Sequence, residues 1–241
     1  MHIRGNPIVL FNAWDAGSAQ AIAAGGAKAI ATSSWSVAAA NGFVDGERIP
    51  LDLAMSNLRR IVDAVEVPVT VDLESGYGDA PDAVAVTMRM AIEVGATGCN
   101  LEDSFPANGK LREPCDQADR ISCARQMADE ANVRFFINAR TDVFFQRPVE
   151  HHDNTMLEEA IERARLYAEA GADGFFVPGL ADIHLIRRLA ETSRLPINVM
   201  VVGESPSVSI LAQNGVARVS YGPRPYLLVM KALEEAARAA I

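Results

Sequence analysis

Short apolar runs alternate along the whole chain with longer amphipathic segments. The apolar runs are rich in β-branched residues, which predicts strands, whereas apolar residues that recur every three to four positions predict helices. The predicted strands are 7–13, 29–34, 67–74, 98–104, 134–142, 174–179, 196–203 and 217–222. The predicted helices are 16–24, 51–65, 81–95, 117–131, 155–170, 181–192, 207–214 and 225–240.

A glycine closes several of these helices just before the next strand. The pattern recurs in AAGGAKAIATS, EVGATGCNLED, EAGADGFFVP and QNGVARVSYG. Glycine suits the left-handed cap that ends a helix. Eight strand–helix units predict an α/β fold, a single (β/α)8 TIM-type barrel over residues 1–241. The competing fold, a doubly wound sheet, carries a glycine-rich phosphate loop after its first strand. The segment NAWDAGSA has no such fingerprint.

Charge and composition narrow the classes of partner. The 241-residue chain has a net charge of −9, which argues against nucleic acid, because nucleic acid binding needs a basic surface. Three cysteines without a CxxC pair are typical of reduced thiols. No run of about 20 apolar residues predicts a membrane helix, and the first apolar run is too short for a signal peptide. We therefore expect a cytoplasmic protein that acts on a small molecule.

Polar side chains gather where the predicted strands end. Asp72 and Glu74 lie two apart at the end of strand 67–74, so they point to the same side. Glu102 lies near the end of the next strand. Crowded carboxylates repel one another unless one takes a proton or a cation neutralises them. Hard oxygen ligands favour Mg²⁺, with Mn²⁺ as the alternative ion. For the pair alone, the simpler interpretation is that Asp72 caps a turn and Glu74 pairs with an arginine.

Four segments resemble the isocitrate lyase/phosphoenolpyruvate mutase superfamily. They are TSSWSVAAANGFVDGE, VDLESGYGD, NLEDS and INARTDVF, and the similarity runs from Asn12 to about Tyr221. The resemblance implies a (β/α)8 barrel that binds Mg²⁺ and a 2-oxo or 2-hydroxy carboxylate. It also implies that a C–C or P–C bond is made or broken next to an enolate. Asp72 is then expected to bind the metal directly, and Glu74 and Glu102 to hold metal-bound waters.

The resemblance also implies which residues contact the substrate. Ser33, Ser34 and Trp35 would bind the carboxylate and the enolate oxygen through side-chain and backbone donors. Arg140 matches the arginine that grips the substrate, which suits the bidentate recognition of a carboxylate by guanidinium. Asp45 matches an acidic residue near the active site. We expect Arg140, Asp45 and Ser33 to act in catalysis.

Two further residues are expected beside the substrate. Asn198 resembles an asparagine of the seventh strand that lines the pocket, and Tyr77 belongs to a loop that the superfamily places beside the active site. The GYG sequence around Tyr77 is equally well explained by a turn that needs permissive backbone angles.

The loop after the fourth predicted strand decides between the branches of the superfamily. The segment SFPANGKLREPCDQADRI lacks the Lys-Lys-Cys-Gly-His signature of the lyase branch, and Cys115 falls at the start of the next helix. Ala107 stands where the phosphonopyruvate branch has a lysine. The remaining groups stabilise an enolate, which favours decarboxylation of an acid such as oxaloacetate. The alternatives are a phosphonopyruvate-type enzyme that cleaves a P–C bond and a non-catalytic barrel that binds a carboxylate.

The last predicted helix, 225–240, is apolar on one face. The resemblance implies that it is exchanged between subunits of a homo-oligomer, either a dimer or a tetramer. The alternative is that this helix docks on its own barrel.

Overall fold

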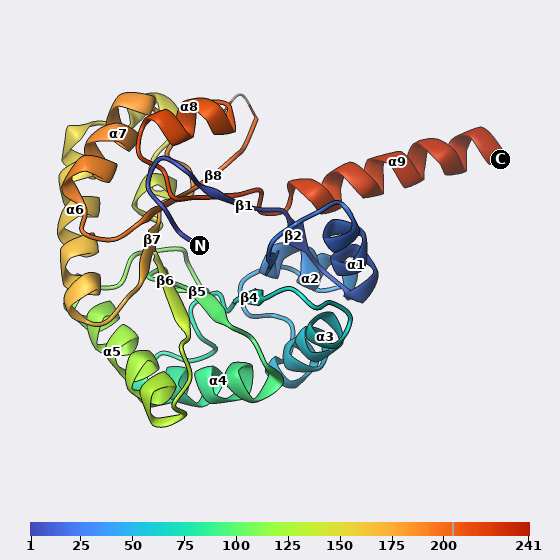
Figure 1. The fold of residues 1–241 in the computed structure, drawn as a ribbon, viewed down its shortest axis with the longest axis horizontal. Coiled ribbons are helices and arrows are strands. Elements are labelled where there is room, and N and C mark those ends of the chain that lie inside the picture. The colour runs from blue at the N-terminus through green and yellow to red at the C-terminus, as the bar shows by residue number, and fades with distance from the viewer. Residues whose placement is uncertain (204) are drawn as a thin grey trace.

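The strands of the computed structural model, which describes residues 1–203 and 205–241, form one parallel sheet that curls into a barrel (Figure 1). The spatial order is β1-β9-β8-β7-β6-β5-β4-β3-β2. The strands are β1 Ile8–Leu10, β2 Asn12–Ala13, β3 Ile30–Thr32, β4 Val69–Asp72, β5 Gly98–Glu102, β6 Phe136–Arg140, β7 Gly174–Phe176, β8 Ile197–Met200 and β9 Arg218–Ser220. The predicted α/β barrel is therefore confirmed.

The prediction of one continuous strand over residues 7–13 is wrong, because the structure has two short strands there, β1 and β2, on either side of Phe11. β1 pairs with β9 and β2 pairs with β3. Only Phe11 separates β1 from β2. One continuous segment therefore pairs with the last strand at its start and with β3 at its end, and this closes the ring of strands. Strands in a barrel are tilted and staggered, and here the first run passes from one neighbour to the other at Phe11.

Helices surround the sheet in the order that the sequence predicts, with one addition. They are α1 Ala16–Ala24, α2 Ser34–Ala40, α3 Leu51–Asp63, α4 Pro81–Val94, α5 Pro114–Glu130, α6 Asn154–Glu169, α7 Ile183–Thr192, α8 Val208–Gln213 and α9 Arg224–Ala240. Short 3-10 helices span Val143–Phe145 and Val149–His151. Helix α2 was not predicted. It begins because the Ser33 side chain caps it, accepting a hydrogen bond from the Ser36 backbone N–H.

The apolar core lies between the sheet and its helices, while the inside of the barrel is polar. Along β5, Cys99 and Leu101 are fully buried in the apolar core, and Cys99 contacts Met88 of α4. The alternate residues Asn100 and Glu102 therefore face the barrel interior. Because of this alternation, the polar residue at the end of β5, Glu102, lies on the interior side of the barrel.

Helix α9 projects away from the barrel instead of covering it (Figure 1). Its only buried residue is Pro225. Val229 and Leu233 are 43% and 61% exposed, although they are apolar. Within the described residues, no helix is both long enough and apolar enough to cross a membrane.

Candidate active site

Three of the predicted site residues end neighbouring strands of the barrel. Asp72 is the last residue of β4, Glu102 of β5 and Arg140 of β6. Glu102 stands opposite Arg140 in the strand register, and their side chains form an ion pair of 2.7 Å. Active sites of such barrels lie at the carboxyl ends of the strands. The structure thus brings an arginine and two carboxylates to the expected end of the barrel.

The guanidinium of Arg140 is held between two carboxylates. Its Nη1 contacts Glu102, while its Nε and Nη2 lie 2.6 and 3.0 Å from the two carboxylate oxygens of Asp142. The Ser104 hydroxyl lies 3.0 Å from Glu102 and 2.8 Å from Asp142. Burial alone would lower the pKa of Arg140, but Glu102 and Asp142 raise it well above its ordinary value. Arg140 is therefore a fixed positive charge.

The carboxylate of Asp72 is oriented by its neighbours. Ser34 donates to Asp72 Oδ2 through both its backbone N–H, at 3.1 Å, and its hydroxyl, at 2.8 Å. Asn100 Nδ2 lies 3.5 Å from Asp72 Oδ1. Ser34, expected to bind substrate, thus binds the carboxylate that was expected to hold the metal.

Glu74 is buried in an unusual backbone conformation. Its φ of 52° lies in the left-handed region, and its side chain is turned so that Oε2 accepts from the backbone N–H groups of Gly46, at 2.8 Å, and Glu47, at 2.6 Å. Its Oε1 is buried without a hydrogen-bond partner. Burial raises the pKa of Glu74 to about 8, and Asp45 contributes to the shift. A proton or a cation on this carboxyl group is therefore favourable near neutral pH.

The loop that carries Asp45 is joined to the loop that carries Tyr77. Glu47 accepts hydrogen bonds from the Ser75 hydroxyl, at 2.7 Å, and from the Tyr77 backbone N–H, at 2.8 Å. Glu47 and Tyr77 both have positive φ, 59° and 57°, which non-glycine residues rarely adopt. Burial raises the pKa of Asp45, and Asp72 adds to the shift. The two loops therefore gather acidic groups close to β4.

The other predicted residues lie around this centre. The Ser33 hydroxyl oxygen accepts from Ser36, at 3.4 Å from its backbone N–H and 3.1 Å from its hydroxyl. Trp35 follows in the first turn of α2 and is 37% exposed. Asn198 is 1% exposed, and its Oδ1 accepts from the Ser220 hydroxyl. Asn198 therefore faces the interior of the barrel.

The oxygen donors around Asp72 suit a hard cation. Glu74 Oε1 has no hydrogen-bond partner, and the pKa values of Glu74 and Asp45 are raised as expected of carboxylates that lack a neutralising charge. In residues 1–203 and 205–241, no group of three His, Cys, Asp or Glu side chains could hold an ion together. The unpartnered Glu74 oxygen is a hard donor of the type that Mg²⁺ takes, and Mg²⁺ usually keeps several water ligands as well.

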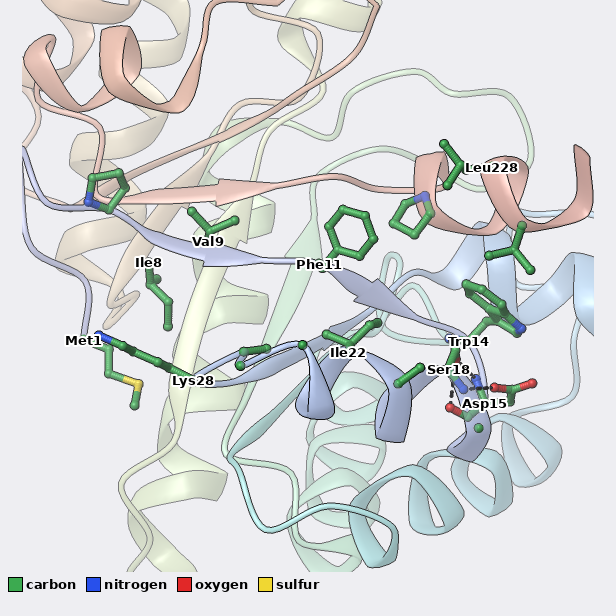
Figure 2. Close-up of a pocket in the computed structure, with 18 of the residues that line it drawn as sticks. Met1, Ile8, Val9, Phe11, Trp14, Asp15, Ser18, Ile22, Lys28 and Leu228 are labelled. Carbon is green, nitrogen blue, oxygen red and sulfur yellow. Dashed lines mark hydrogen bonds between the residues drawn. The ribbon is translucent and has the colours of Figure 1, made fainter. Parts of the chain in front are cut away.

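The cavity at this centre is small, whereas a much larger groove lies on the outside of the barrel. A cavity of about 20 Å³ lies against Asp72, Glu74 and Tyr77. A groove of about 1080 Å³ lies on the outside of the barrel, between α1, β1 and the start of α9 (Figure 2). The outer groove lacks Arg140, Glu102 and Asp72, so it is not the active site.

Three polar residues of the site were not predicted, namely Glu47, Asn100 and Ser104. Asn100 could have been found, because it lies two residues before Glu102 on the same face of a strand. The contact of Glu47 with Ser75 joins two loops distant in the chain, and no local pattern signals it.

Comparisons with known proteins show the family of the chain and agree with its fold. The family model described as phosphoenolpyruvate phosphomutase matches residues 1–241. A solved structure from Burkholderia cenocepacia J2315, described as a suggested phosphonomutase, is 58% identical, covers 98% of this chain and 96% of its own, and has a TM-score of 0.96. The 2-methylisocitrate lyase of Salmonella typhimurium is 31% identical over 83% of this chain and 68% of its own length. Oxaloacetate decarboxylase 2 of Pseudomonas putida is 27% identical over 82% of this chain and 64% of its own length.

Proposed function

Because the chain belongs to the phosphoenolpyruvate phosphomutase family, we propose that it is a Mg²⁺-dependent lyase that cleaves a C–C bond of a small 2-oxo or 2-hydroxy acid. One observation carries the proposal. Arg140, Glu102 and Asp72 end three neighbouring strands, so that a fixed cation and two carboxylates meet at one end of the barrel. This arrangement suits the binding of a carboxylate beside a metal ion.

The chain's own residues would bind and orient the acid. A guanidinium recognises a carboxylate through parallel N–H donors, and Arg140 supplies them in our proposal. The Ser33 oxygen accepts from Ser36, which leaves its own hydroxyl proton to donate to substrate. The backbone N–H of Trp35, in the first turn of α2, lacks a partner within its helix. These donors would stabilise an enolate oxygen as its charge develops.

Asp72 would hold the metal ion directly, and Glu74 and Glu102 would hold its water ligands. Bound Mg²⁺ would supply positive charge to the developing enolate. The hydrogen bonds from Ser34 and Asn100 fix the direction of Asp72, which is the usual role of residues behind a metal ligand. Asp45 and Tyr77 would close the pocket above Asp72.

Decarboxylation of a β-keto acid such as oxaloacetate is the reaction we favour. The bond to the departing carboxylate breaks, CO₂ leaves, and the electron pair forms an enolate that then takes a proton. This step needs no acid or base to start it. Cys115 is exposed at the start of α5, which makes it an unsuitable acid for cleavage of a larger hydroxy acid. The similarity to an oxaloacetate decarboxylase supports the same choice.

Calorimetry with oxalate, which resembles the enolate of pyruvate, tests the site without assuming a substrate. We expect oxalate to bind with Mg²⁺ present and not after chelation, and oxaloacetate to be converted to pyruvate and CO₂. Binding without turnover of oxaloacetate, but with turnover of phosphonopyruvate, would favour P–C cleavage, for which the match to the family model is the support. Binding with no turnover of either acid would favour a non-catalytic barrel. No binding in any condition would refute the proposed site.

We also propose that α9 is exchanged between the subunits of a homo-oligomer. The groove beside α1 and β1 is lined by apolar side chains such as Val9, Phe11 and Ile22 (Figure 2). Val9 and Phe11 are each 38% exposed. On α9, Val229 lines the edge of the same groove and is still 43% exposed, and Leu233, one turn further on, is 61% exposed. A second copy that places its α9 over this groove would bury both surfaces in a symmetric dimer.

A further inference from the structure

A buried arginine lies inside the barrel, beneath the proposed active site. Arg218 is in β9 and is 2% exposed. Among the described residues, no carboxylate forms an ion pair with it, unlike Arg140 or Arg163. Its Nη2 donates to Asn100 Oδ1 at 3.3 Å. Burying an arginine without an ion-pair partner is costly, so this residue calls for an explanation.

The side-chain amide of Asn100 joins Arg218 to Asp72. Its Oδ1 accepts from Arg218 and, at 2.9 Å, from Asn138 Nδ2. Its Nδ2 lies 3.5 Å from Asp72 Oδ1. A guanidinium can only donate hydrogen bonds, and an ionised carboxylate can only accept them. Arg218 at one end and Asp72 at the other therefore favour the same orientation of the Asn100 amide.

Arg218 is charged at neutral pH despite its burial. Burial lowers the pKa of Arg218 to about 10, and Asp72 opposes the shift. Burial and Arg218 lower the pKa of His2 to about 4, so His2 is uncharged at neutral pH. Among the groups that oppose the lowering of the pKa of Arg218, Asp72 has the largest effect.

We propose that Arg218 is a positioning residue for Asp72, acting through the side-chain amide of Asn100. The inference rests on the proposed function, in which Asp72 binds the metal ion. Without Arg218, the amide of Asn100 is held only by the amide of Asn138, which donates to it at 2.9 Å. Asn138 Oδ1 has no hydrogen-bond partner of its own, so the two amides can turn together, with Asn138 Oδ1 accepting from the turned Asn100. The Oδ1 of Asn100 would then face Asp72, and the repulsion between the two oxygens would turn the carboxylate away from the metal.

The test is the affinity of the full chain for Mn²⁺ alone, measured by electron paramagnetic resonance with calorimetry. We expect Arg218→Met to weaken Mn²⁺ binding about tenfold, as is typical for a residue behind a metal ligand. Arg218→Lys keeps a charged donor and should bind within about threefold of the wild type. Arg125→Met removes a part-buried arginine that pairs with Asp173 and donates to the backbone of Phe135 and Gly171. It is the control for the loss of a part-buried guanidinium, and the folded variant should bind Mn²⁺ with unchanged affinity.

A double-mutant cycle separates the proposed role from a general loss of stability. If Arg218 acts through Asn100, Arg218→Met should add no further loss of Mn²⁺ affinity to the Asn100→Ala variant. Thermal melting of each variant shows whether it is folded. If Arg218→Met does not fold, weaker binding by folded Asn100→Ala together with near wild-type binding by Arg218→Lys would support the inference.

Two results would overturn it. Folded Arg218→Met that binds Mn²⁺ as tightly as the wild type would leave Arg218 a purely structural residue. Independent losses in the double variant would show that Asn100 does not transmit the effect. A wild-type chain that binds no Mn²⁺ is a different result, because it refutes the metal site of the proposed function and the inference with it.

Discussion

Arg140 Nη1 lies 2.7 Å from Glu102 Oε2, and the two residues stand opposite each other at the ends of β6 and β5. The orientation of the Arg140 guanidinium is therefore fixed in the absence of substrate. Asp142 holds its other edge.

Arg140→Lys should weaken oxalate binding by at least about tenfold, because an ammonium group cannot reproduce the fork that contacts two carboxylates. Calorimetry with Mg²⁺ present measures the change. Arg147→Lys, at an exposed arginine of the following loop, is the control and should bind oxalate as the wild type does. Equal binding by both variants would exclude Arg140 from substrate recognition.

Asp72→Asn should abolish the metal dependence of oxalate binding. The substitution keeps the shape of the side chain but removes the charge that a Mg²⁺ site needs. Titration with Mn²⁺ measures the loss directly. Asp116→Asn, at an exposed aspartate in the first turn of α5, is the matched control. Unchanged Mn²⁺ affinity in Asp72→Asn would place the ion elsewhere.

The stability of the protein should depend on His2 in mildly acidic solution. The His2 ring stacks on Phe136 at 3.8 Å, and burial followed by Arg218 lowers its pKa from 6.5 to about 4. The unfolded chain therefore binds a proton that the folded chain does not between these pH values, so the contribution of His2 to stability is complete above pH 6.5 and is lost as the pH falls toward 4.

Urea unfolding at pH 7 and pH 5 checks this expectation. His2→Gln, which does not titrate, should lose less stability than the wild type between the two pH values, by about 1 kcal/mol. Parallel losses in the two proteins would show that His2 has an ordinary pKa.

Gly98→Ala should destabilise the barrel by about 2 kcal/mol or more, because overpacking forces the backbone to move. A Cβ at Gly98 would lie 2.6 Å from the backbone oxygen of Phe136 on the neighbouring strand. Gly17→Ala is the control. A Cβ at Gly17 would lie 3.7 Å from the carboxylate oxygen of Asp15, an ordinary contact. Gly17 lies in helix α1, where alanine is preferred to glycine, so the substitution should cost nothing. Denaturant midpoints of the two variants measure the difference, and equal midpoints would contradict the expectation.

Exchange of α9 predicts that charges on its apolar face should dissociate the oligomer. Val229→Glu combined with Leu233→Glu should give monomers in analytical ultracentrifugation, because two carboxylates would then enter the apolar groove. Lys231→Glu, on the opposite face of α9, changes the net charge by the same amount and should leave the oligomer intact. If the wild-type chain is already monomeric, α9 is not exchanged.

The repeating strands and helices of the fold could be predicted from the sequence, whereas contacts between loops that are distant in the chain could not. The predicted barrel is confirmed because each strand and helix has its own periodic pattern, and the glycines mark where they join. Helix α2 was missed because Ser33, Ser34 and Ser36 look like a loop until the Ser33 cap is seen.

The candidate site shows the same division. Asp72, Glu102 and Arg140 could be predicted, since each ends a strand. The hydrogen bonds that Ser34 donates to Asp72 were not predicted. These contacts join two strand ends through side-chain geometry, which a linear pattern does not contain. Glu47 is fixed by positive backbone angles in a loop, and no propensity of glutamate indicates them.

The division of the first strand at Phe11 has a consequence for synthesis on the ribosome. The partner of β1 is β9, so the pairing of Ile8 with Arg218 closes the ring. At typical elongation rates, about 10 to 40 s pass between the synthesis of these two residues. During that time β1 and the growing edge of the sheet have unpaired backbone groups, the kind of edge that recruits other chains. We therefore expect the nascent chain to depend on chaperones until its last strand emerges.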